Sequence, residues 1–186
     1  MSKPSSGHFN GTTGKRIAQG ISSTVSKKRD IIAKKKSSLD LREHPTKYKQ
    51  MSSKKLKNLR EKEDKRTITK EEYKHKEWQK RLTKRRNKAI EDFWKEERRK
   101  IRNGLPTTRN WSAQQIKEIL SGRKPKFKGK TMASHHTYSV AKYPHLANLP
   151  QLIYPVTQYE HIQGWHGGNT RNSLPGIPIK HIEEEF

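Results

Sequence analysis

The sequence contains no cysteine, and this absence excludes disulfide bonds and thiolate metal sites. A transition-metal site would have to use histidine, aspartate, glutamate or asparagine. Apolar residues make up only 28% of the 186 residues, too few to bury the whole chain in one core. The apolar runs are short, and the N-terminus lacks the apolar core of a secretory signal. The sequence therefore predicts no insertion of this chain into a membrane.

Acidic residues are also scarce, since 18 Asp and Glu accompany 43 Lys and Arg and leave a net charge of +25. This excess lies in the first 130 residues. From residue 131 onward, three basic residues face four acidic ones, and six of the nine histidines lie in this nearly neutral segment. A basic excess of this size predicts a polyanionic partner, foremost nucleic acid. We expect the chemistry to reside in the histidine-rich segment.

The basic part of the chain divides into two predicted regions. Residues 1–45 are rich in Ser, Gly, Thr and Lys, which is typical of a disordered basic linker. Residues 46–106 predict a basic helical region, in which a long helix begins after Thr69 and ends near Arg102. A weaker, highly charged helix is expected before it, over residues 52–65. Several apolar residues of the long helix recur at helical spacing and predict one packed stripe: Tyr73, Trp78, Leu82, Ile90, Phe93, Trp94 and Ile101.

Residues 107–186 predict a small domain of mixed secondary structure. A short helix is expected after Ser112, and a basic loop, RKPKFKGK, follows it. The segment TMASHHTYSV is β-prone, QLIYPV is a short apolar strand, and TQYEHIQGWHGG predicts a helix that begins at Thr157. The predicted fold class is α+β.

The histidines of this domain have the spacing that phosphodiester hydrolysis would use. Hydrolysis needs a divalent metal ion at the phosphate and a general base that activates water. Adjacent histidines in a strand point to opposite faces, so His135 and His136 can divide these two functions if a bulge redirects one of them. A second strand and a helix would bring His161 and His166 back to the first strand, and Asn148 in the loop can orient the base.

The order His-His, Asn, His, His within about thirty residues resembles the HNH (ββα-metal) nucleases. The segments SHHTYSV, YPHLAN, LIYPVT and GWHGGN look like the nuclease domain with an SHH signature found at the C-terminus of bacterial polymorphic toxins. The run from HPTKYKQMSSKKLKNL to RNWSAQQIKEIL resembles the region that precedes this domain in LXG-type toxins of Firmicutes.

This resemblance implies that His135, His161 and His166 bind one divalent metal ion, that His136 is the general base and that Asn148 orients it. The ion would be Mg²⁺, Mn²⁺, Ni²⁺ or Zn²⁺, and an imidazole-rich site favours the transition metals. In a regular helix, however, two residues five apart differ by about 140° in azimuth. His166 would therefore have to come from the end of the helix, or His145 would replace one of the two.

The resemblance also implies a partner and a location. We expect a low-specificity endonuclease, with DNA favoured over RNA as substrate, that is secreted by a type VII-like route and acts in the cytoplasm of the target cell. In the producer it would stay in the cytoplasm with a cognate immunity protein, which the basic region predicts to be acidic. The same basic region would bind nucleic acid without sequence preference. Arg171 and the amides of its glycine-rich loop are candidates for binding phosphate.

Two other functions fit the residues. In one, two histidines serve as acid and base of a metal-independent ribonuclease toxin. In the other, the protein binds nucleic acid without catalysis and its histidines hold a structural metal ion. At the C-terminus, His181 and the sequence EEEF are expected to be solvated.

Overall fold

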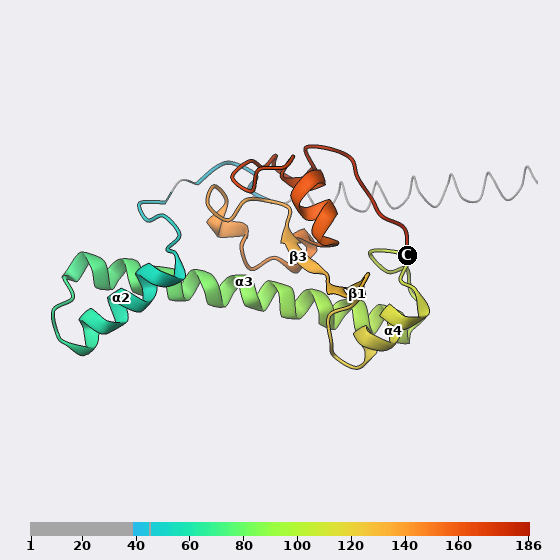
Figure 1. Cartoon of the computed structure of the whole chain (residues 1–186), viewed down its shortest axis with the longest axis horizontal. Helices are drawn as coiled ribbons and strands as arrows, with labels where there is room; N and C mark the ends of the chain where they lie inside the picture. Colours follow the sequence, from blue (N-terminus) through green and yellow to red (C-terminus); the bar gives the residue numbers. More distant parts are fainter. Residues whose placement is uncertain (1–38, 45) are drawn as a thin grey trace, which may run out of the picture. The chain divides into compact units, whose positions relative to one another are not determined.

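The computed structural model describes residues 39–44 and 46–186 (Figure 1). The predicted linker, residues 1–45, therefore lies outside the described residues except for 39–44. The chain divides into two compact units, residues 1–41 and residues 42–186, and the second unit contains every helix and strand described below. The boundary predicted at residue 107 falls inside this second unit. In the described part of the chain, no helix has the length and apolar character needed to span a membrane.

Two helices begin the second unit, as the sequence predicts. Helix α2 spans Ser53–Asp64, and the side chain of Ser52 caps it by accepting a bond from the Lys55 amide. Helix α3 spans Lys70–Arg102. Thr69 and Glu72 form the expected capping box, in which each side chain accepts a bond from the other residue's backbone amide.

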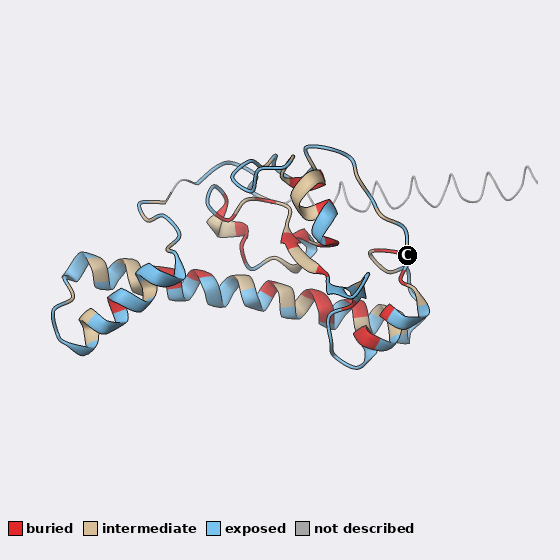
Figure 2. Cartoon of the chain, viewed as in Figure 1, coloured by how far each residue is buried: buried red, intermediate tan, exposed pale blue. Residues whose placement is uncertain are grey.

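Helix α3 packs through one face, and its other residues face solvent (Figure 2). Ala89, Phe93 and Trp94 belong to the main hydrophobic core, which also contains Trp111, Ile119, Met132 and Ile153. Tyr73, predicted on the same stripe, is instead 46% exposed. It lies in the first turn, where the ammonium group of Lys76 lies 5.1 Å from its ring centroid.

A short helix and a small hairpin follow α3. Helix α4 spans Ala113–Leu120 and begins with the capping box predicted from Ser112. The segment predicted as a basic loop forms instead an antiparallel hairpin of β1, Lys126–Phe127, and β2, Lys130–Thr131. Its turn is possible because Gly129 has a φ of +77°, which glycine adopts at little cost.

The second sheet supplies the ββ part of the fold. Strands β3, Ala133–His136, and β4, Ile153–Val156, pair antiparallel, so that His135 lies opposite Tyr154 and His136 opposite Ile153. Their connection contains two 3₁₀ turns, η1 over Pro144–Leu146 and η2 over Pro150–Leu152. A π-helix, η3, Glu160–Trp165, comes after β4. The predicted α+β class is confirmed.

The sheet of β3 and β4 packs against helix α3. It contacts η2, β4 and α4, and the Trp94 Nε1–H donates to Ser134 Oγ of β3 at 3.0 Å. Each contact joins residues far apart in the sequence, and together they fix β3 and β4 against one side of the helix. The long basic helix and the histidine strand therefore share one core.

The C-terminal segment is packed at Glu184 and Phe186, so the expectation that EEEF is solvated is wrong for these two residues, whereas His181, Glu183 and Glu185 are exposed as expected. The Phe186 ring stacks on Trp111 with centroids 5.7 Å apart. The Glu184 amide donates to the buried carboxylate of Glu160 at 2.6 Å, and the Lys180 amide donates to Gly164 O at 2.9 Å. Trp111 lies just before α4, and Glu160 and Gly164 lie in η3. The end of the chain therefore stabilises the π-helix.

Candidate metal centre and catalytic site

Three of the predicted metal ligands lie together. His135 projects from β3 and is 8% exposed, His161 lies in η3, and His166 follows the last residue of η3. One ring nitrogen from each lies within 4.8 Å of the other two. The ring centroids are 5.0 Å apart for His135 and His161, and 4.9 Å apart for His161 and His166. Three imidazole nitrogens at this separation can bind one metal ion.

The π-helix explains how two histidines five residues apart can face the same site. The helix predicted to begin at Thr157 is present, and Thr157 and Glu160 accept bonds from each other's backbone amides, but residues Glu160–Trp165 have π-helical hydrogen bonding in place of the regular pattern. In a π-helix the repeat bond joins residues five apart, so His161 and His166 come to the same side. His145, the alternative ligand, lies in η1, outside this cluster, and its ring centroid lies 4.2 Å from that of His44.

Burial keeps His135 and His161 in the form that can bind a metal ion. Removal from water, together with the nearby histidines, lowers the pKa of His135 to about 3. Burial likewise lowers the pKa of His161. His166 donates its Nδ1–H to the carbonyl of Asn172 at 2.6 Å, which leaves the lone pair on Nε2. A neutral ring with an available lone pair is the species that coordinates a metal ion.

A buried ion pair holds the π-helix at the start of the site. Arg109 donates two bonds to the Glu160 carboxylate, at 2.6 and 2.7 Å, and both side chains are almost fully buried. Burial alone would raise the pKa of Glu160, but the bonds from Arg109 and from the amides of Thr157 and Glu184 keep it below its usual value. This pair joins residues 51 positions apart and fixes the helix that carries His161.

His136 lies on the other side of the strand, in a different environment. Its Nε2 lies 3.3 Å from the carbonyl oxygen of Ala147. Because a carbonyl only accepts, this bond requires the proton on Nε2 and leaves the lone pair on Nδ1. Burial, together with the nearby guanidinium of Arg86, lowers the pKa of His136 to about 4. His136 is therefore neutral at pH 7 and able to accept a proton.

Asn148 follows the residue that bonds to His136, and α3 holds it. The Arg85 Nη2 donates to Asn148 Oδ1 at 2.6 Å and to the His145 carbonyl at 2.8 Å. The structure therefore places Asn148 next to the base through the backbone of Ala147, with its own side-chain oxygen bonded to Arg85. This leaves its role as the residue that orients the base a prediction.

Arg171 lies in the exposed loop that follows η3. Its backbone amide donates to Asn169 Oδ1 at 3.0 Å, and its side chain is exposed. The same loop supplies the Asn172 carbonyl that orients His166. The role of Arg171 in binding phosphate therefore remains a prediction.

Three residues near the site were missed in the sequence: Arg85, Arg86 and Arg109. The first two belong to the basic run KRLTKRR, and nothing local distinguishes them from solvated arginines. The one available signal is that Arg86 falls on the apolar stripe of α3, four residues after Leu82 and three before Ala89.

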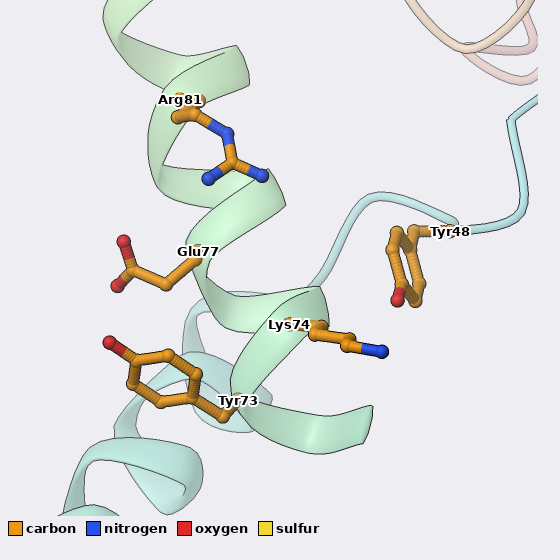
Figure 3. A pocket seen from close by; sticks show the side chains of 5 residues that line it. All are labelled: Tyr48, Tyr73, Lys74, Glu77 and Arg81. Carbon is orange, nitrogen blue, oxygen red and sulfur yellow. The ribbon is translucent and has the colours of Figure 1, made fainter. Parts of the chain in front are cut away.

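A separate cavity of about 430 Å³ lies beside the first turns of α3 (Figure 3). It is lined by Tyr48, Tyr73, Lys74, Glu77 and Arg81. The histidine cluster contributes nothing to its lining, so this cavity is distinct from the candidate metal centre.

Residues 76–157 match the family model described as GHH signature containing HNH/Endo VII superfamily nuclease toxin. This segment is therefore similar to the nuclease toxin domains of the HNH/Endo VII superfamily. The matched segment begins within α3 and includes His135, His136 and Asn148, but it ends before His161 and His166. Among curated proteins, nothing matches this chain. Nucleases of this superfamily use a divalent metal ion, and the histidine cluster is a group that can bind one.

Proposed function

We propose that the protein is a metal-dependent, low-specificity endonuclease that cleaves DNA and acts as an antibacterial toxin. The observation that carries this proposal is the pairing of a three-imidazole cluster with a neutral histidine on the opposite face of the same strand. The adjacent residues His135 and His136 thereby supply a metal ligand and a proton acceptor. Hydrolysis of a phosphodiester requires both capacities at one phosphate.

His135, His161 and His166 would hold the metal ion. The three nitrogens fit this role because they converge within 4.8 Å and because burial keeps at least two of the rings neutral. When bound, the ion supplies positive charge at the phosphate and at the leaving oxygen. A donor set of imidazoles favours Ni²⁺ or Zn²⁺ over Mg²⁺ or Mn²⁺, though all four are candidates.

His136 would activate the attacking water. Its Nδ1 takes one proton from water, and the resulting hydroxide forms a new P–O bond in line with the leaving oxygen. The bond between phosphorus and the leaving oxygen breaks, and that oxygen takes a proton from solvent. The Ala147 carbonyl keeps the imidazole in the tautomer that this step needs.

The substrate and its binding follow from the charge distribution. The first 130 residues carry the positive charge, and α3 presents many of these side chains to solvent next to the catalytic face. Contacts of this kind bind phosphates without reading sequence and weaken as salt rises. We favour DNA, and RNA is the alternative substrate.

The same positive surface supports two further parts of the proposal. An acidic immunity protein would bind it in the producing cell, because complementary charge speeds association and blocks access of nucleic acid. The toxin would leave the cell by a type VII-like route and act in the cytoplasm of a target cell. A pull-down of this chain with a co-expressed acidic neighbour protein tests the first part.

The decisive experiment compares cleavage of plasmid DNA and of total RNA by wild type, His136→Ala and His135→Ala, with added divalent metal and with EDTA. Both variants should lose about 10³-fold or more in rate, but only His135→Ala should also lose metal binding in calorimetry. RNA cleavage that persists in EDTA would establish the metal-independent ribonuclease. Full activity of His136→Ala would leave the cluster as a structural metal site.

A further inference from the structure

Arg86 is directed at the catalytic face by its place on α3. Leu82, four residues earlier, packs in a small core with Ala147, and Ala89, three residues later, packs in the main core with Ile153. Residues at these spacings lie on one helix face. Arg86 therefore lies between the contacts to Ala147 and to Ile153.

These two contacts flank His136. Ile153 is its cross-strand partner, and the Ala147 carbonyl is the acceptor for its ring. A guanidinium between them is directed at the base, and the influence of Arg86 on the pKa of His136 agrees with this placement.

The Arg86 guanidinium lacks an anionic partner in the described part of the chain. Its Nε is buried without a hydrogen bond, and its one side-chain contact is a 3.3 Å bond from Nη1 to the neutral Gln50 Oε1. No described carboxylate forms an ion pair with it. Burial lowers the pKa of this arginine, which expresses the cost of removing the charge from water. Buried arginines are normally paired with carboxylate or phosphate.

We propose that Arg86 is a catalytic residue that binds a non-bridging oxygen of the scissile phosphate beside His136. The guanidinium fork matches a phosphate, with Nε and Nη2 as parallel donors, while Nη1 keeps its bond to the Gln50 amide oxygen. The charge stabilises the additional negative charge that develops as hydroxide adds to phosphorus. This proposal deepens the proposed function and rests on it for the identity of the anion.

The first test is steady-state cleavage of a defined duplex by wild type and Arg86→Ala with saturating metal. We expect kcat to fall about 100-fold, as for removal of one donor to a transition-state oxyanion, with a smaller change in KM. Millimolar guanidinium ion should restore part of the activity of Arg86→Ala, whereas Arg86→Lys, which lacks the fork, should remain impaired.

Two controls separate this role from a structural one. Gln50→Ala removes the only side-chain partner described for Arg86 and should change kcat less than threefold. Arg102→Ala removes an exposed arginine at the end of α3 and should show neither the loss nor the rescue. If Gln50→Ala matched Arg86→Ala, or if guanidinium restored nothing, the proposed role for Arg86 would be wrong.

A binding measurement separates this proposal from the proposed function. Calorimetry with inorganic phosphate and metal-free protein should show binding to wild type that Arg86→Ala weakens at least fivefold. If wild type cleaved no nucleic acid but Arg86→Ala still weakened phosphate binding, the proposed nuclease function would be refuted and the anion site at Arg86 would be supported. If phosphate bound both proteins equally while wild type cleaved DNA, the Arg86 site alone would be refuted.

Discussion

The two faces of strand β3 differ in how they are held. On the His135 side, the buried pair of Arg109 and Glu160 fixes the π-helix, and a packed C-terminal segment covers it. On the His136 side, the base is held by a loop carbonyl, and Arg85 and Arg86 of α3 approach it. Metal ligands need fixed geometry, whereas a base and a phosphate-binding arginine need access to substrate. One strand therefore separates a half-site held by a buried ion pair from one held by a loop and by α3.

The largest effect should come from removing the ion pair of Arg109 on the His135 side. Arg109→Met leaves the Glu160 carboxylate buried without its ion-pair partner, which costs about 3–5 kcal/mol of unfolding free energy. Metal affinity should fall as well, because the helix that carries His161 loses its anchor. Urea unfolding and metal titration measure the two losses.

Lys128→Met provides the matched control for this prediction. Lys128 pairs with Glu184 at 3.3 Å, but its side chain is largely exposed, so the loss should stay below about 1 kcal/mol. The double variant Arg109→Met with Glu160→Met should recover part of the stability, because no unpaired charge remains. Equal losses for Arg109→Met and Lys128→Met would show that the buried pair does not anchor the site.

The second prediction concerns pH and involves both faces. Without metal, the pKa of His135 is about 3 and that of His136 about 4, both below the value near 6.5 of an unfolded histidine. The unfolded chain therefore binds more protons in this range, so stability is fully present above about pH 6.5 and falls as pH decreases toward 4. Each imidazole should contribute up to about 1.4 kcal/mol per pH unit.

Urea unfolding in EDTA at a series of pH values measures this slope. His136→Gln should remove the contribution of one face and His135→Gln that of the other, so the two variants report the faces separately. Added metal should make the free energy of unfolding depend more steeply on pH in wild type and in His136→Gln, but not in His135→Gln. A stability that stays constant between pH 7 and pH 4 would contradict the burial of both rings.

Sequence patterns predicted the local parts of this architecture well. The capping residues Thr69 and Ser112 gave the starts of α3 and α4, because a cap acts within three residues of itself. The adjacent positions of His135 and His136 predicted that their side chains lie on opposite faces of β3. The π-helix and the docking of Phe186 escaped prediction because they depend on contacts between distant segments, such as Arg109 with Glu160 and Trp111 with Phe186. The hairpin of Phe127 escaped prediction because each of its strands has only two residues. The partners Arg109 and Glu160 carry no local signal that they pair.

The smallest effect should come from removing the hydrogen bonds of Arg85 on the His136 side. Arg85→Ala removes the bonds to Asn148 and to the loop that carries the Ala147 carbonyl, so the base loses part of its orientation. We expect a fall in kcat of about tenfold, the lower end of effects from groups that orient a catalytic residue, with unchanged metal affinity. Lys84→Ala removes the same charge from the exposed neighbouring position and should weaken nucleic-acid binding without changing kcat. Equal kcat values for the two variants would mean that Arg85 contributes only charge, and that the loop holds His136 without help from α3.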